Sequence, residues 1–465
     1  MVNTRLHGKL VFAATSGFYS EFITLGQLAR PPDPNLYQSC LNRRLYQGHF
    51  GQDNELAKID DLNSSDAIVV WAEDLKEKMP VLYLRVRQAV KKGVKLIVFG
   101  HTNKTLSDIA DVFYGKETVS KNFEIIKDVS KLNEIKNYVI GKNVTAIIGK
   151  STPQQSDDSV TELFEFLRSN SNTKILNAYT KGNIYGAFQT LENIKGTRDF
   201  VENISGENTD LLFIVGADPV GRSFYSNQIK SIIENLDTVV SLDIFNHETA
   251  ELSNFVIPVS STLGEKEGTF TNIEFRTSRI DKLVPSPGQT VSDWEFITSL
   301  MNFAGLSNDS NSLEDLNNKA FVNIETSSKP VFDNLDKPSN LDGIINVYEP
   351  AINTSENNST EALFYTGEKL YGDSATERHS ESISLLGSKK FIEISQNIVD
   401  KFNLTSGKCS MVQDDMEVTL SYKINDNLPD NLIYIPINRR DLNKFNFSKE
   451  ITFLPSRVEE ALNVN

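Results

Sequence analysis

The stretch DAIVVWAEDLKEKMPVLYLRVRQAVKKGVKLIVFG, from Asp66 to Gly100, decides the fold class of this chain. Each end is a short apolar run without alternation, which is typical of a strand buried on both faces of a parallel sheet. Between the runs, Pro80 suits the first position of a helix and Gly93 suits its end. Apolar residues recur at helical spacing in this segment, at Leu82, Val86, Ala89 and Val90. The stretch therefore predicts a strand, a helix and a parallel strand, and with them the α/β fold class.

A similar pattern recurs about 144 residues further along the chain. DLLFIVGADP, from Asp210 to Pro219, is again an apolar strand run, and a later strand, TVVSLDIF, ends at Phe245. The segment between them has an apolar helical face made of Ile229, Ile232, Ile233 and Leu236. Two interpretations stay open: a degenerate internal repeat in which Asp66 and Asp210 start equivalent strands, or two units that look alike because the fold class demands it.

These units predict two Rossmann-like lobes, each built on a parallel sheet. The first lobe spans residues 1–140 and opens with a strand at Lys9–Ala14, followed by a helix that Ser20 caps. The second lobe spans residues 141–305 and contains the strand NVTAIIGK and the helix SVTELFEFLRSN.

The second lobe is predicted to close with the helix SDWEFITSLMNFAG, in which Ser292 and Glu295 form a capping box. Residues 306–362 are rich in Asn and Ser and have little apolar surface, so they predict a linker or a loop-rich excursion. Residues 363–465 have short strands with partial alternation, separated by turns. They predict a small C-terminal domain of the β-barrel type.

The charge of the chain argues against a nucleic-acid partner. Asp and Glu outnumber Lys and Arg by 62 to 47, and a net charge of −15 repels a phosphate backbone. The amino terminus has only a five-residue apolar run, and no later segment approaches the roughly 20 apolar residues of a membrane span. We expect a soluble chain in the cytoplasm.

The sequence contains a partial match to a nucleotide-binding motif and isolated residues of metal-binding types, but the spacing of these residues differs from what such motifs require. IIGKST, at Ile147–Thr152, resembles the end of a P-loop, but Val144 stands where that loop needs a glycine. The glycine fingerprint of dinucleotide-binding folds is also missing from the sequence. The histidines are scattered singly, and each is expected to be solvated rather than to bind a metal; they are His7, His49, His101, His247 and His379.

The two cysteines limit the iron chemistry of this chain. Iron–sulfur clusters are usually held by four thiolates, and the sequence has only Cys40 and Cys409. Cys409 lies in a predicted strand and is expected to be a buried structural thiol. Cys40 is a weak candidate nucleophile because Arg43 and Arg44 lie nearby in sequence and favour a thiolate. No catalytic residue and no metal ligand is predicted, and the chain is expected to carry neither iron nor molybdenum.

The segment HETAELSNFVIPVSSTLGEKEGTFTNIEFR, from His247 to Arg276, resembles a strand-to-loop segment of the molybdopterin oxidoreductase superfamily. Other stretches resemble parts of that superfamily in the same order along the chain. They are SEFITLGQLAR, VRQAVKKGVKLIVFGHTNKTLSDIADVF, FIVGADP and, in the tail, FIEISQNIVDKFNLTSGKCSMV. The resemblance covers nearly the whole chain and implies the two α/β lobes and a C-terminal six-stranded barrel.

Within the superfamily, the chain is most similar to the C-terminal part of the large G subunit of bacterial NADH:quinone oxidoreductase, respiratory complex I. That likeness implies a scaffold without a cofactor of its own, with iron–sulfur clusters and FMN in partner chains or in a missing amino-terminal region. The implied partners are other subunits of the peripheral arm, and the implied place is the inner face of the cell membrane, without insertion. Catalytic relatives have a molybdenum-binding Cys or selenocysteine after the early helix, where this chain has Arg44 or, within alignment error, Cys40.

The same resemblance leaves two other functions open. One is a truncated molybdopterin-dependent oxidoreductase, such as a formate dehydrogenase α subunit, and the other is a free-standing regulator or assembly factor. In cofactor-bearing relatives, the loop around GTFTN would face the pterin phosphate, which makes four residues candidates for a remnant pterin pocket: Gly268, Thr271, Asn272 and Arg276. Gly264 and Gly268 permit positive φ in this loop. A simple turn between two strands is the alternative explanation of the loop.

Overall fold

The computed structural model of the chain divides into two compact units. The first unit comprises Met1–Phe50, Tyr179–Gly221 and Gln228–Tyr348, and the second comprises Gly51–Ala178, Arg222–Asn227 and Glu349–Asn465. The structure describes residues 9–14, 57–71, 74–99, 104–114, 129–148, 166–167, 169–178, 183, 209–222, 226–262, 264–274, 276–303, 305, 312–315, 363–367, 370–371, 375–386, 391–426, 428, 430, 432–436, 442, 445 and 452–455.

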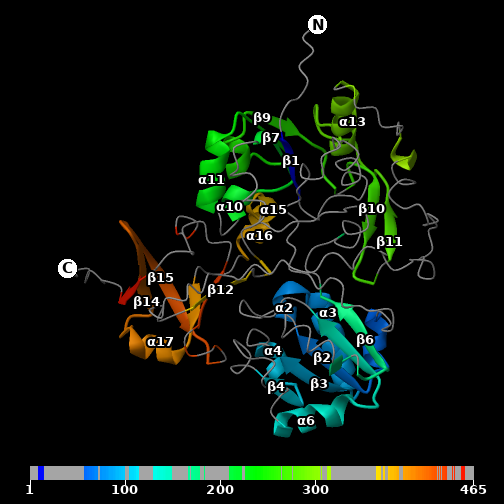
Figure 1. Cartoon of the computed structure of the whole chain (residues 1–465), viewed down its shortest axis with the longest axis vertical. Helices are drawn as coiled ribbons and strands as arrows, with labels where there is room; N and C mark the ends of the chain where they lie inside the picture. The colour runs from blue at the N-terminus through cyan, green and yellow to red at the C-terminus, as the bar shows by residue number, and fades with distance from the viewer. Residues whose placement is uncertain are drawn as a thin grey trace. The chain divides into compact units, whose positions relative to one another are not determined.

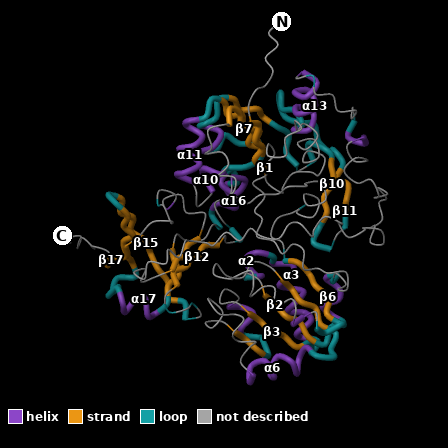
Figure 2. The backbone as a smooth tube through the Cα atoms, in the orientation of Figure 1, coloured by secondary structure: helices purple, strands orange, loops and turns teal. Residues whose placement is uncertain are grey.

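The second unit contains a five-stranded parallel sheet with the strand order β4-β3-β2-β5-β6. Its strands are β2 (Ala67–Trp71), β3 (Lys95–Phe99), β4 (Val112–Tyr114), β5 (Val144–Ile148) and β6 (Thr173–Asn177). The helices between and before them are η1 (Ile59–Asn63), α2 (Leu75–Lys78), α3 (Pro80–Lys91), α4 (Lys104–Ser107) and α6 (Val129–Val139). Figure 2 shows the orange strands with purple helices beside them, α3 and α6 on opposite sides. Every residue of β2 and β5 is buried, as expected when helices cover both faces.

Helix α3 forms where the sequence predicts it. Pro80 occupies its first turn, where a missing N–H costs no hydrogen bond. The helix ends before Gly93, whose φ of 100° suits glycine and whose N–H donates to the carbonyl of Val90. Its buried face consists of Leu82, Tyr83, Val86 and Ala89. Val90 was also predicted to face inward, but its side chain is only half-buried. The βαβ unit from β2 to β3 is confirmed.

The first unit contains a four-stranded parallel sheet with the order β1-β7-β8-β9. Its strands are β1 (Lys9–Ala14), β7 (Thr209–Val215), β8 (Thr238–Asp243) and β9 (Phe255–Pro258), and a hairpin is formed by β10 (Gly268–Thr271) and β11 (Thr277–Ile280). The helices that follow these strands are α10 (Pro219–Arg222), α11 (Ser226–Asn235), α12 (Glu248–Glu251) and α13 (Asp293–Phe303). In α11, Ile229 and Ile233 are buried, as its apolar face predicts. The carboxylate half of the capping box is present in α13, since the N–H of Ser292 donates to Glu295 Oε2 over 3.2 Å.

The strands do not follow the predicted lobe boundary at residue 140. Strand β1 pairs with β7, about 200 residues away in sequence, and Figure 1 shows the blue strand beside the green one. Strands β5 and β6, which lie beyond residue 140, join the sheet of β2. An apolar run shows that a strand is buried, but the identity of its neighbour depends on tertiary packing. The predicted strands at Asp66 and Asp210 are confirmed, since β2 starts directly after Asp66 and β7 includes Asp210.

The C-terminal part of the chain is a six-stranded mixed sheet with the order β12-β16-β13-β15-β14-β17. Its strands are β12 (Leu363–Gly367), β13 (Phe391–Ile394), β14 (Lys408–Gln413), β15 (Met416–Ile424), β16 (Leu432–Pro436) and β17 (Thr452–Pro455), and its helices are α15 (Ala375–Arg378), α16 (Glu381–Ser384) and α17 (Gln396–Lys401). Among the described strands, β12 and β17 are the two ends of the order, so the sheet is open where the sequence predicts a barrel. Ser395 caps α17 by accepting from the N–H of Ile398.

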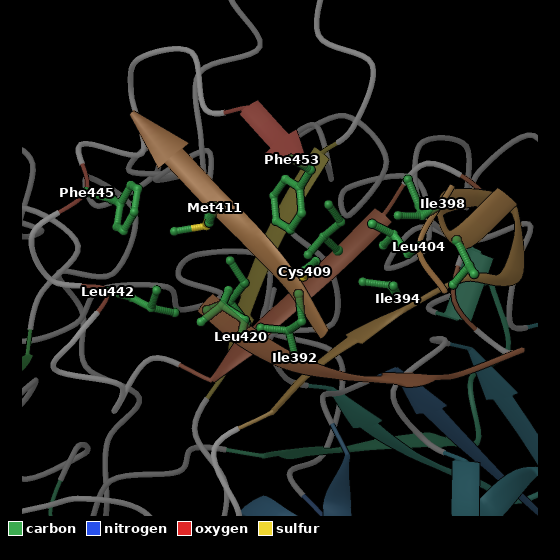
Figure 3. Close-up of a cluster of buried hydrophobic side chains, with 13 residues drawn as sticks. Ile392, Ile394, Ile398, Leu404, Cys409, Met411, Leu420, Leu442, Phe445 and Phe453 are labelled. Carbon is green, nitrogen blue, oxygen red and sulfur yellow. The ribbon is translucent and has the colours of Figure 1, made fainter. Parts of the chain in front are cut away.

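One apolar core supports this C-terminal sheet. Figure 3 shows its side chains converging from β13, β14, β15, β17 and α17, with Cys409 among them. Cys409 is fully buried beside Ile392, Met411 and Leu420, which confirms the prediction of a structural thiol. A thiol in such surroundings behaves as a small apolar side chain.

Several predicted features lie outside the described residues. They are the helix after Ser20, the region of Cys40, Arg43 and Arg44, the loop after Ile148, most of the helix SVTELFEFLRSN and all but 312–315 of the predicted linker. In the part of the chain that the structure describes, no helix has both the length and the apolar character needed to cross a membrane.

Candidate functional site

Three aromatic side chains stand at the carboxyl edge of the five-stranded sheet. Trp71, Phe99 and Tyr114 are the last residues of β2, β3 and β4, and the strand register places them next to one another. The rings of Trp71 and Phe99 lie 5.4 Å apart and those of Phe99 and Tyr114 lie 5.3 Å apart, centre to centre. The Tyr114 hydroxyl donates to Glu134 Oε2 over 3.0 Å. The stack gives this edge of the sheet a continuous, buried aromatic layer.

Two donors at this edge are buried and lack a hydrogen-bond acceptor among the described residues. They are the indole Nε1 of Trp71, at the end of β2, and the hydroxyl of Thr105, in the helix α4 that follows β3. A buried donor without an acceptor destabilises a protein by about 1–3 kcal/mol. Such groups are rare in native proteins and often mark a place where a ligand or water supplies the acceptor.

The two donors lie near the point where the strand order of the sheet reverses. The strand order reverses at β2, since the chain proceeds to β3 and β4 on one side and to β5 and β6 on the other. In open α/β sheets, ligands bind outside the carboxyl ends of the strands at the point where the order reverses. Trp71 ends β2 at this point. Nothing in the local sequence distinguishes Trp71 from an ordinary core residue, so the sequence does not predict it as a site residue.

The carboxyl edge of the four-stranded sheet is occupied by an ionic network. His247 is buried between two carboxylates, with its Nε2 3.0 Å from Asp243 Oδ2 and its Nδ1 3.3 Å from Asp218 Oδ1. Asp218 follows β7, Asp243 ends β8, and His247 precedes the first residue of α12. The prediction of a solvated His247 is therefore wrong, because only 2% of its side chain is exposed. In the sequence, the carboxylate of Asp243 four residues before His247 is the feature that could have indicated a paired, buried histidine.

The environment of His247 favours the charged ring. Burial by itself lowers the pKa of His247, but hydrogen bonds to Asp218 and Asp243 and their charges outweigh it and raise the pKa to about 9. The backbone nitrogen of Ala250 also lies 3.3 Å from Nδ1, in a contact that would require a neutral ring. Because a neutral ring would turn one nitrogen lone pair toward a carboxylate, we assign the doubly protonated form.

Asp218 is the centre of this network. Its Oδ1 accepts hydrogen bonds from the N–H of Gly221 (3.0 Å), the N–H of Thr249 (3.2 Å) and the Thr249 hydroxyl (2.7 Å). Burial raises the pKa of Asp218, while His247 and these donors hold it well below its usual range. The N–H of Val220 donates to Thr249 Oγ1, so several donors of the loop after β7 have acceptors inside the protein. A Cβ at Gly221 would collide with the Asp218 carboxylate, so the glycine is required there.

A second buried ion pair holds the loop that follows β9. Lys266 Nζ lies 2.6 Å from Asp293 Oδ2, at the start of α13, and each side chain is only 2% exposed. Glu265 accepts from the N–H of Ser261 over 2.7 Å. Gly264, with a φ of 93°, places its carbonyl where it accepts from the N–H of Leu283. Glu265 and Lys266, the charged residues that follow the apolar run in the sequence, therefore hold the loop in place through contacts inside the protein.

Two of the predicted pterin-pocket residues lie within β10. Gly268 is the buried first residue of the strand, paired with Ile280, and it is not one of the glycines with positive φ. Of the two glycines that permit positive φ in this loop, Gly264 adopts it and Gly268 does not, because Gly268 takes part in the strand ladder. Thr271 ends β10, is fully buried, and donates its N–H to Asn183 Oδ1 over 2.8 Å.

The other two candidates form the hairpin turn. Asn272 Oδ1 accepts from the N–H groups of Glu274 and Arg276, each over 2.9 Å, and the N–H of Asn272 donates to the carbonyl of Arg276. Asn272 and Arg276 are exposed. The fold thus brings Thr271, Asn272 and Arg276 close together at one end of the hairpin. In the described part of the chain, no group of three His, Cys, Asp or Glu side chains is arranged to hold a metal.

Comparisons with known proteins identify the relatives of the chain. A family model described as molybdopterin oxidoreductase matches residues 31–303. The formate dehydrogenase 2 subunit alpha of Methanococcus maripaludis is 36% identical over 129 residues, 26% of this chain and 19% of that protein. The assimilatory nitrate reductase catalytic subunit of Bacillus subtilis is 33% identical over 107 residues, 23% of this chain and 15% of that protein. These matches span less than a fifth of the length of either relative.

A solved structure supports the fold over most of the chain. The acetylene hydratase of Pelobacter acetylenicus superposes with a TM-score of 0.57 at 12% sequence identity, covering 92% of this chain and 79% of that one. At this identity, the likeness concerns the fold alone. It agrees with the parallel α/β sheets and the mixed C-terminal sheet described above.

Proposed function

The chain belongs to the molybdopterin oxidoreductase family, and from this premise we propose that it is part of a molybdopterin-dependent oxidoreductase. The relatives above are named as subunits of formate dehydrogenase and nitrate reductase. Their names support this function better than the scaffold of respiratory complex I that the sequence analysis favoured. The substrate class follows that of the named relatives, which is a small oxyanion such as formate or nitrate.

The observation that carries the proposal is the pair of buried donors at the carboxyl edge of the five-stranded sheet that have no acceptor among the described residues. A pterin with its phosphate presents ring nitrogens and oxygens that accept hydrogen bonds, which is what Trp71 Nε1 and the Thr105 hydroxyl lack among the described residues. These two residues would hold the cofactor at the point where the strand order reverses. When bound, the cofactor would supply the redox chemistry, while the protein positions it and excludes water.

The test measures pterin in the native assembly that contains the full chain. Trp71→Phe keeps the aromatic stack with Phe99 but removes the indole donor, and we expect it to lower pterin content at least several-fold. Trp294→Phe is the matched control, because Trp294 is the second of the two tryptophans and lies in α13. Circular dichroism checks that both variants fold. Equal pterin content in the two variants, or none in the wild type, rejects the proposed role of Trp71.

A second candidate keeps the chain as a cofactor-free scaffold of the G subunit of NADH:quinone oxidoreductase. It is favoured by the loop residues, since Asn272 Oδ1 is occupied by its own turn and Asp218 accepts the donors after β7. In that case iron–sulfur clusters and FMN belong to partner chains of the peripheral arm. Absence of pterin and molybdenum, with flavin and iron–sulfur subunits in the same purified assembly, supports this candidate.

A further inference from the structure

We propose that the carboxyl edge of the four-stranded sheet contains its own anion. The Asp218 carboxylate takes the place that an external phosphate or carboxylate would occupy, with His247 as its buried counter-ion. The loops that follow β7 and β8 are therefore closed to anionic ligands, and a cofactor phosphate would bind outside these two loops. The inference does not depend on which of the two proposed functions holds, because it concerns only the loops that follow β7 and β8.

The donors around Asp218 are those of an anion site. Its Oδ1 accepts from the N–H of Gly221 in α10, and from the N–H and hydroxyl of Thr249 in α12, over distances of 2.7–3.2 Å. His247 Nδ1 lies 3.3 Å from the same oxygen. Backbone N–H groups, a hydroxyl and a buried cation that converge on one oxygen are groups that proteins use to hold phosphates and carboxylates. Here a side chain of the protein fills the site.

The surrounding charge excludes a second anion. His247 also faces Asp243 at 3.0 Å, so one cation already balances two carboxylates. Glu248 adds a further carboxylate, whose Oε2 lies 2.9 Å from the place where a Cβ of Gly221 would stand. An arriving phosphate would meet three carboxylates and one imidazolium, and repulsion between like charges is strong in a buried site.

The contacts of Asp218 also connect the segments that follow strands β7 and β8. The carboxylate joins the loop after β7 to α12, while Asp243 anchors His247 from the end of β8. The N–H groups of Ile244 and Phe245 donate to Asp243 Oδ1 over 2.7 and 3.2 Å, so this carboxylate is fixed as well. The network therefore holds the loops after β7 and β8 in one arrangement.

Chemical rescue tests the proposal. Asp218→Ala removes the internal anion and keeps the donors of Gly221 and Thr249, while Asp243 remains as the partner of the His247 cation. We expect a lower melting temperature in this variant, and a saturable rise of several degrees with added formate or acetate at constant ionic strength, because a ligand that binds only the folded state stabilises it. The wild type is expected to show no such rise.

The matched control is Thr249→Val, which removes a donor of the network without leaving room for an anion. It is expected to lose stability without rescue by formate. Equal effects of formate on the wild type and Asp218→Ala, or no effect on Asp218→Ala, overturn the proposal. If Asp218→Ala does not fold, Asp218→Asn decides by NMR: a His247 pKa that falls from about 9 supports the proposal, and an unchanged pKa overturns it.

Discussion

His247 and Lys266 are cations buried to the same degree, and each pairs with a carboxylate more than 20 residues away in sequence, Asp218 and Asp293 respectively. Removing such a charge from water is unfavourable unless partners replace the lost hydration. His247 has Asp218 and Asp243, and Lys266 has Asp293. At the scale of single residues, the structure of the first unit thus depends on charge pairs as well as on apolar packing.

The stability of the wild type is expected to depend on pH through His247. The pKa of about 9 in the folded state exceeds the ordinary value of 6.5, so the stabilisation is fully present below pH 6.5 and is lost as pH rises through 9. The melting temperature should therefore fall between these pH values. His247→Gln should start lower and stay nearly flat over the same window. A parallel fall in both proteins would show that another group is responsible.

Breaking the pair of Lys266 and Asp293 should cost more than removing it entirely. Lys266→Met leaves the Asp293 carboxylate buried without its cation, which destabilises by about 3–5 kcal/mol. The double variant Lys266→Met, Asp293→Leu removes both charges and should recover a large part of this loss. Urea unfolding of the wild type, both single variants and the double variant measures the coupling. Additive effects would mean that the two side chains do not interact.

At the scale of elements, the hairpin of β10 and β11 shows how one side chain defines a turn. Asn272 Oδ1 accepts two backbone N–H groups between the strands, which a short amide or carboxylate does well. The strands are paired from Gly268↔Ile280 to Thr271↔Thr277, so the turn sets their register. The exposed position of Asn272 is thus compatible with a purely structural role.

Asn272→Ala should lower the free energy of unfolding by about 1 kcal/mol, because two turn N–H groups lose an acceptor and turn to water. Asn272→Asp keeps the acceptor and should stay close to the wild type. Chemical denaturation of the three proteins gives the comparison. If Asn272→Asp loses as much as Asn272→Ala, the oxygen is not what holds the turn. A loss of activity at unchanged stability in Asn272→Ala would instead support the predicted pterin-pocket role.

At the scale of the whole molecule, the two parallel sheets are not made from consecutive halves of the chain. Strand β1, near the amino terminus, pairs with β7. The strands that lie between them in sequence, β2 to β6, form the other parallel sheet. A unit made of separated segments closes long loops, and each such closure reduces the entropy of the chain. The pairing of β1 with β7 therefore has to contribute enough to offset that loss.

Deleting residues 1–14 should uncover β7 and leave the sheet of β2 intact. We expect faster amide hydrogen exchange in β7, because its partner strand is missing, and unchanged protection in β2 and β3, which belong to the other unit. Deletion of residues 456–465 is the control and should leave β7 protected. Equal loss of protection in β2 and β7 would contradict the separate membership of the two strands.

The sequence by itself determined several helices and strands of this protein. The strand Lys9–Ala14, the start of α3 at Pro80 and its end before Gly93 were all predicted, because proline, positive φ and apolar periodicity act on neighbouring residues. The family resemblance came from a contiguous segment for the same reason. Only the tertiary structure decided that β1 pairs with β7, that His247 lies between Asp218 and Asp243, and that the Trp71 indole is buried without an acceptor among the described residues. Each of these features depends on groups from distant segments. Tertiary packing decides which segments lie beside a side chain, and therefore whether that side chain is solvated, paired or buried without a partner.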